Sequence, residues 1–68
     1  MDANIRNYII QNFKNNGSND IKESIEESIK KGDEITLPGL GVFFEIIWQN
    51  SNDIEKEKIL TTIQSKLA

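Results

Sequence analysis

The chain has 68 residues, of which 37% are hydrophobic and 28% are charged, a balance typical of a folded domain and not of a disordered one. Eight basic and eleven acidic side chains give a net charge of −3. Cysteine and histidine are both absent, which excludes disulfide bonds, thiol nucleophiles and the usual zinc ligands and general base. We therefore expect a single small domain that is not an enzyme, with no catalytic residues, no bound metal ion, no cofactor and no small-molecule substrate.

The apolar segments of the chain are short. The longest near the start is residues 8–10, and the others are residues 42–44 and 46–48, which Glu45 separates. A membrane-spanning helix needs ~20 apolar residues. We therefore expect a protein that does not enter a membrane and is not secreted.

Three segments place short polar side chains before an isoleucine, at residues 3–5, 18–21 and 51–54. Such side chains accept hydrogen bonds from the free N–H groups of a first helical turn. Asp20 and Glu23 have the three-residue spacing of a capping box. Asn52 and Glu55 have the same spacing. This chemistry predicts helices that begin near residues 4, 19 and 53.

Apolar residues recur at helical spacing in three stretches, which cover about residues 4–14, 19–31 and 53–67. Their apolar stripes are Ile5, Ile9 and Phe13; Ile21, Ile25 and Ile29; and Ile59, Leu60, Ile63 and Leu67. The first two stretches end at Gly17 and Gly32, because glycine tolerates the left-handed conformation that terminates many helices. We expect the last of these stripes, that of residues 53–67, to be buried.

The middle of the chain is compatible with two folds. In one, residues 35–37 and 42–48 are the strands of a β-hairpin around a Pro-Gly-Leu-Gly turn. In the other, residues 39–49 form a third helix, with Pro38 near its first turn, where a missing N–H costs little.

We favour the helix, because an isolated two-stranded hairpin is marginally stable and no later segment offers a third strand. Gly39 and Gly41 weigh against it by about 1 kcal/mol each relative to alanine. The predicted fold is thus mainly α, a small bundle of four short helices. The alternative is an α+β fold with a central hairpin.

Residues 32–48, which read GDEITLPGLGVFFEIIW, resemble the small acid-soluble spore protein I family. The opening NIRN of residues 4–7, the isoleucines at 25 and 29, and the EKILTT of residues 57–62 agree with it in order and spacing. The resemblance implies a sporulation protein made in the forespore and stored in the spore core. It brings no assigned reaction and no site residues.

Residues 32–43 are also similar to the segment that follows the second helix in bacterial histone-like HU proteins, where a strand, a glycine turn and a second strand occur. An HU protein then continues into a long basic arm that enters the DNA minor groove. Here the chain continues instead into the acidic helix start of residues 51–57. This similarity therefore implies an HU-like first half only under the α+β alternative, and it does not imply the DNA-binding function.

Glu45 is the one carboxylate that lies among large apolar residues. Burial would raise its pKa and would let it act as an acid or base. Since no histidine, lysine or nucleophile lies nearby in the sequence, we interpret Glu45 and Gln49 as the solvent-facing side of the third helix.

Leu40, Phe44 and Trp48 fall four residues apart and form a candidate interface. The narrow stripe of the second helix would cover them only in part, and an exposed patch of this kind favours a homodimer or a protein partner. The alternative, that these side chains are simply the core of a monomer, stays open.

A second hypothesis is weak DNA binding, as in a minor nucleoid protein of the spore. Arg6, Lys14, Lys30 and Lys31 would then converge at the corner between the first two helices, where the last three are the candidate DNA contacts. The net negative charge disfavours this hypothesis, because phosphate repels an acidic domain unless its lysines gather on one face.

Overall fold

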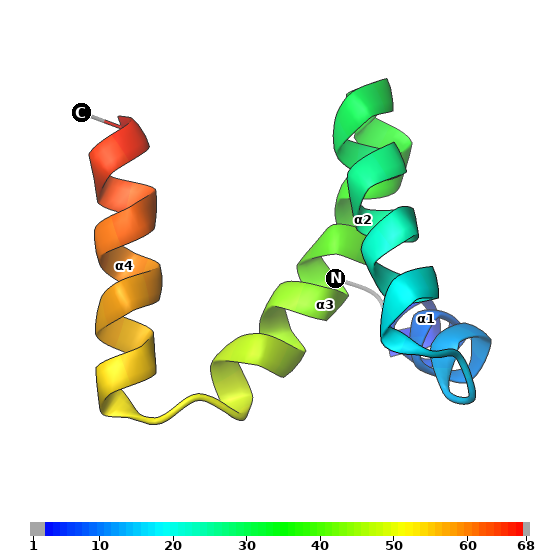
Figure 1. The fold of residues 1–68 in the computed structure, drawn as a ribbon. Helices are drawn as coiled ribbons and strands as arrows, with labels where there is room; N and C mark the ends of the chain where they lie inside the picture. The colour runs from blue at the N-terminus through cyan, green and yellow to red at the C-terminus, as the bar shows by residue number, and fades with distance from the viewer. Residues whose placement is uncertain (1–2, 68) are drawn as a thin grey trace.

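The computed structural model describes residues 3–67, which form four α-helices (Figure 1). These are α1 (Ala3–Phe13), α2 (Ser18–Lys31), α3 (Leu37–Gln49) and α4 (Asp53–Leu67), with a 3₁₀ turn, η1 (Glu34–Thr36), between α2 and α3. Within this range there is no β-strand. The mainly α prediction is therefore confirmed, and the α+β alternative with its central hairpin is wrong.

The third helix begins two residues earlier than predicted, at Leu37, with Pro38 in its first turn. It ends at Gln49, and the side-chain amide of the capping residue Asn50 donates a hydrogen bond of 2.8 Å to the carbonyl of Ile46. A helix satisfies its backbone groups internally, whereas a hairpin would leave two unpaired edges. It also presents apolar side chains on several sides, so both α1 and α2 pack against it.

One predicted capping box is confirmed and the other is wrong. At the start of α4, the Asn52 side chain accepts a hydrogen bond from the Glu55 N–H, and the Glu55 carboxylate accepts one from the Asn52 N–H, both at 2.8 Å. At the start of α2, Gly17 is the capping residue and no side chain caps the helix. Because α2 already begins at Ser18, Asp20 lies inside the first turn, where its charge favours the positive end of the helix dipole.

The core lies where α1 crosses α3. Val42 is the residue with the least exposed surface, 1%, and it is the only fully buried hydrophobic residue between residues 3 and 67. Gly39 allows close approach of the two helices, since a Cβ there would lie 3.3 Å from Cδ1 of Ile9. Phe13 and Phe43 meet edge to face with ring centroids 5.2 Å apart. The three N-terminal helices thus form one packed unit around α3.

The fourth helix stands apart from this unit (Figure 1). The radius of gyration of the chain is 13.0 Å, where a compact domain of this length has about 11 Å. No residue of α4 is buried, and Leu67 is 80% exposed, so the prediction that the stripe of α4 is buried in this chain is wrong. The reason is that the connection of residues 50–52 carries α4 away from α1 and α2, so neither of these helices covers it.

Because α4 receives little help from packing, its capping box should matter more than usual. We expect Asn52→Ala to destabilise the first turn of α4 by about 1 kcal/mol. The measurement is NMR, through reduced helical chemical shifts and faster amide exchange over residues 53–58. Asn19→Ala is the matched control, because Asn19 lies in the first turn of α2, where no side chain caps the helix. Equal effects of the two substitutions would contradict the role of the box.

Candidate interaction surface

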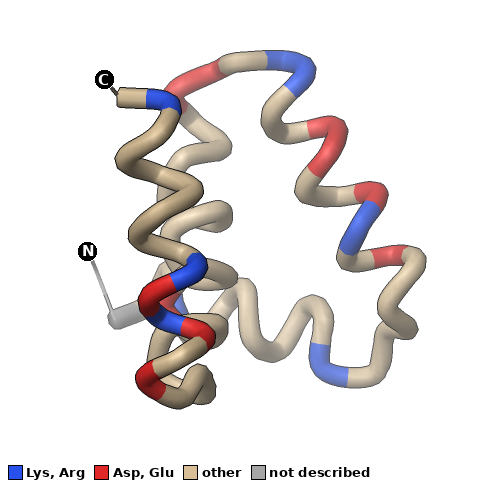
Figure 2. The backbone as a smooth tube through the Cα atoms, turned by 60° about the vertical axis from the view of Figure 1, so that its left-hand side comes forward, with Lys and Arg blue, Asp and Glu red and all other residues tan. Residues whose placement is uncertain are grey.

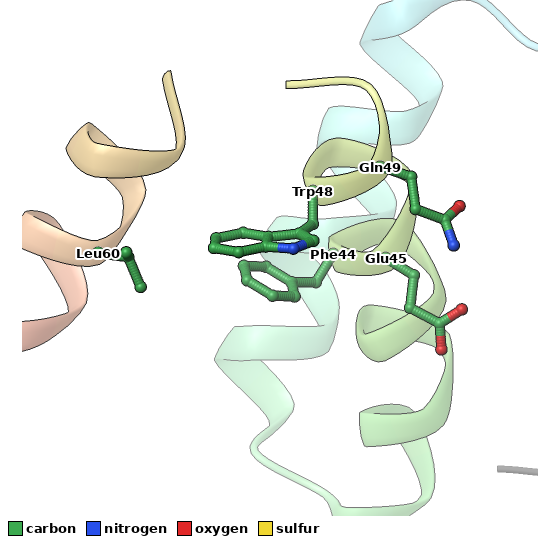
Figure 3. A pocket seen from close by; sticks show the side chains of 5 residues that line it. All are labelled: Phe44, Glu45, Trp48, Gln49 and Leu60. Atoms are coloured by element: carbon green, nitrogen blue, oxygen red, sulfur yellow. The ribbon is translucent and has the colours of Figure 1, made fainter. Parts of the chain in front are cut away.

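The side of α3 that faces α4 carries a pair of stacked aromatic rings. The rings of Phe44 and Trp48 lie 6.1 Å apart at an interplanar angle of 28°. Both project towards α4, where Leu60 lies opposite them, whereas Glu45 and Gln49 project to the other side of α3 (Figure 3). These five residues line a groove of about 280 Å³. Phe44 remains 43% exposed, so the pair is accessible from solvent.

A cation–π contact joins the two helices at this point. The Lys56 ammonium lies 5.2 Å from the centroid of the Trp48 ring. Lys56 lies near the start of α4. This contact and the capping box therefore both stabilise the direction in which α4 continues from residues 50–52.

The groove extends along both helices. Next to the aromatic pair is a further hollow of about 330 Å³, where Phe44 and Ile47 of α3 face Ile59 and Ile63 of α4. We call the two hollows together the α3–α4 groove. Its apolar walls are Phe44, Ile47 and Trp48 on α3 and Ile59, Leu60 and Ile63 on α4.

The predicted interface residues lie on one face of α3, as their spacing of four requires in a helix. Phe44 and Trp48 line the α3–α4 groove, and Leu40 lies further along the same face, half-buried. The α4 wall of the groove was not predicted from the sequence. The isoleucines and leucines of α4 have helical spacing, and this spacing is the same whether another helix covers the stripe or not.

A second groove, of about 320 Å³, lies between the three N-terminal helices. Its walls are mainly apolar side chains, among them Ile10 of α1, Ile21 of α2 and Ile46 of α3. Ile47 lines both grooves. The two grooves therefore meet at this residue of α3.

Glu45 is neither a buried acid nor a purely solvent-facing residue. Its two carboxylate oxygens accept hydrogen bonds of 2.9 Å from Nε and Nη2 of Arg6, a bidentate ion pair between α3 and α1. These hydrogen bonds lower the pKa of Glu45 against the opposing effect of desolvation, and they raise the pKa of Arg6. The pair escaped sequence reasoning because its members lie 39 residues apart.

The structure does not bring the candidate DNA contacts together. Lys14 follows α1 directly and lies next to the start of α2, whereas Lys30 and Lys31 form the other end of α2. A helix of 14 residues is about 20 Å long, and most of the charged positions between its ends are acidic, as the red segments of the tube show (Figure 2). Arg6, the fourth cation of the predicted corner, is bound to Glu45.

The carboxylates of the chain do not form a metal-binding cluster in the range from residue 3 to residue 67. In that range, also, no helix combines the length and the apolar character that crossing a membrane requires.

Comparison with known proteins finds one family throughout. The model of the family described as "Small, acid-soluble spore protein I" matches residues 3–67. A protein of that name from Geobacillus sp. (strain WCH70) is 45% identical over 94% of this chain and 90% of its own. The corresponding proteins of Bacillus velezensis and Bacillus subtilis (strain 168) are 42% and 40% identical, each over 98% of this chain and 94% of theirs. No solved structure matches.

The Arg6–Glu45 pair makes stability depend on pH in a defined direction. Because the pKa of Glu45 is lower in the folded chain than its ordinary value of 4.5, the contribution of the pair is fully present above pH 4.5. It is lost as the pH falls through the lower folded value, where the unfolded chain binds more protons. We expect Glu45→Gln to flatten the fall in unfolding free energy below pH 4.5, as measured by urea titrations at several pH values.

The control for this experiment is Glu27→Gln, at an exposed position of α2. It should leave the slope of stability against pH close to that of the unchanged chain. If Glu45→Gln and Glu27→Gln change the slope equally, the ion pair contributes nothing specific.

Proposed function

This chain belongs to the small, acid-soluble spore protein I family, and we propose that it acts in the spore core by associating with a second copy of itself and not by catalysis. The observation that carries the proposal is the stacked pair of Phe44 and Trp48, which is half-exposed and lines the α3–α4 groove. The expected interface is the face of Leu40, Phe44 and Trp48.

The physical argument concerns the cost of leaving these rings in water. Burying apolar surface contributes roughly 25 cal/mol per Å² of area, and a folded monomer normally places large aromatic rings in its core. Tryptophan at the centre of an interface is also the residue most often responsible for binding energy. Here α4 and the connection leave the Trp48 ring beside an open groove, which suits it to contact a partner.

The chemistry of the acidic residues supports a non-catalytic role. A general acid or base needs a pKa near the working pH. Glu45, the carboxylate with the most apolar surroundings in the sequence, is held by Arg6 in its charged form, with its pKa lowered. Through this ion pair, Glu45 links α3 to α1.

The alternative role, weak DNA binding in the spore, rests on Lys14, Lys30 and Lys31. About 20 Å of acidic helix separates Lys14 from the other two, so they offer no single basic face for a phosphate backbone. We therefore place this role second.

NMR separates the two roles. When duplex DNA is added to the isotope-labelled protein at low salt, we expect no amide shifts localised at Lys14, Lys30 and Lys31, since these cations are dispersed. Localised shifts that disappear at higher salt, and on changing Lys30 and Lys31 to glutamate, would instead support the nucleoid role.

Association is tested by analytical ultracentrifugation over a wide concentration range. We expect a concentration-dependent dimer whose dissociation constant rises about 30-fold or more in Trp48→Ala, the effect of losing a residue that contributes about 2 kcal/mol. Tyr8→Ala is the matched control, because Tyr8 is an exposed aromatic residue of α1 outside both grooves. A mass that stays monomeric at every concentration would overturn the proposal.

A further inference from the structure

The fourth helix carries an apolar stripe that the rest of the described chain, residues 3–67, leaves largely exposed. We call this the α4 stripe, and its members are Ile59, Leu60, Ile63 and Leu67. Three of the four are more than 40% exposed, and Leu67 reaches 80%. Since a helix of 15 residues is marginal in water without packing, a stripe of this size indicates a contact that the isolated chain lacks.

The surface area of the chain measures how much contact is missing. The exposed area is 5764 Å², whereas a compact chain of 7.8 kDa exposes about 4,400 Å². The excess is about 1,400 Å² for each copy. Two copies that bury such an area on each side would form an interface of the size found in permanent homodimers, which is 2,000 Å² or more in total.

Part of this exposed surface is apolar and lies on the two walls of the α3–α4 groove, where Phe44, Ile47, Leu60 and Ile63 are each more than 40% exposed. One wall is α3, which is apolar except along the side of Glu45 and Gln49. The other wall is the α4 stripe. The two walls face each other across a short connection, in the manner of an open helical hairpin (Figure 1). The space between them suits another amphipathic helix.

We propose that this helix is α4 of a second copy, so that two α3–α4 hairpins interlock about a twofold axis and form a four-helix bundle. In this arrangement each α4 stripe packs between α3 and α4 of the partner, and α1 and α2 remain on the outside. The inference rests on the proposed self-association and deepens it, because it assigns half of the interface to a helix other than α3.

A second copy fits better than an unrelated protein for a structural reason. A twofold interface needs a surface that is complementary to itself, and one hairpin here supplies both an apolar wall and an amphipathic helix that would cover it. The polar residues that begin α4 alternate in sign, as Glu55, Lys56, Glu57 and Lys58, so that one copy of α4 does not repel another through a block of like charge.

The two isoleucines near the ends of α4 provide a matched pair of substitutions. Ile63 lies in the α4 stripe, and Ile54 lies nine residues away, which is half a turn round the helix. Both are exposed in the isolated chain, at 41% and 72%. An aspartate at position 54 also lies in the first turn, where the helix dipole favours negative charge. The proposal therefore predicts opposite outcomes for the same chemical change.

The experiment is sedimentation of Ile63→Asp and Ile54→Asp over the concentration range in which the unchanged chain forms its dimer. We expect the dissociation constant of Ile63→Asp to rise at least 100-fold, with loss of helical chemical shifts confined to α4. Ile54→Asp should stay dimeric. A dimer that survives Ile63→Asp, while Trp48→Ala still dissociates it, overturns the interlocked arrangement and leaves self-association through α3 intact. A chain that is monomeric without substitution overturns both.

A direct measurement on the unchanged chain removes any dependence on the folding of the variants. Equal amounts of ¹³C-labelled and unlabelled protein are mixed, and isotope-filtered NOEs then report contacts between copies alone. We expect NOEs between the methyl groups of Ile59 and Ile63 in one copy and the rings of Phe44 and Trp48 in the other. NOEs between copies that involve only α3 would overturn the proposal.

Discussion

The contact on which the rest of the structure depends is the crossing of α1 and α3. Gly39 of α3 lies close to the Ile9 side chain of α1 there, and the Arg6–Glu45 ion pair joins the same two helices. Val42, the residue with the least exposed surface, also belongs to α3. A chain of this size buries only about 60% of its unfolded surface, so it has no second core to rely on. Because α1 packs against one side of α3, a different side of α3 is left exposed to solvent. The exposed aromatic pair is thus a consequence of how the small core is built.

The central helix has an unusual position in this arrangement. It is apolar over most of its circumference, as expected for a helix with neighbours on every side, yet within residues 3–67 the elements packed most closely against it are α1, α2 and η1. Such a sequence is consistent with a fold that is complete only in an assembly. The family relationship places this chemistry in the spore, where a domain of this size that lacks cysteine must be stabilised by noncovalent contacts alone.

The sequence predicted the helices well, because their signals are local. The spacing of the apolar residues, the glycine at position 32 and the Asn52–Glu55 box each act within one or two turns of chain. The choice of helix for residues 39–49 needed a further argument, that no later segment offers a third strand. What could not be predicted were the relations between distant segments, namely the Arg6–Glu45 pair and the isolation of α4. Helical spacing shows that a stripe exists but does not show which helix covers it, or even which molecule.

The connection of residues 50–52 divides the chain into two units of unequal stability. The contacts between α1, α2 and α3 join residues far apart in sequence, so these helices open together, whereas α4 is held mainly by bonds within its own turns and by Lys56 on Trp48. In hydrogen exchange, the amides of α4 would then report a local opening that is separate from global unfolding. Under the proposed association, dilution would accelerate exchange most in α4, since fewer contacts within the chain oppose the local opening of this helix.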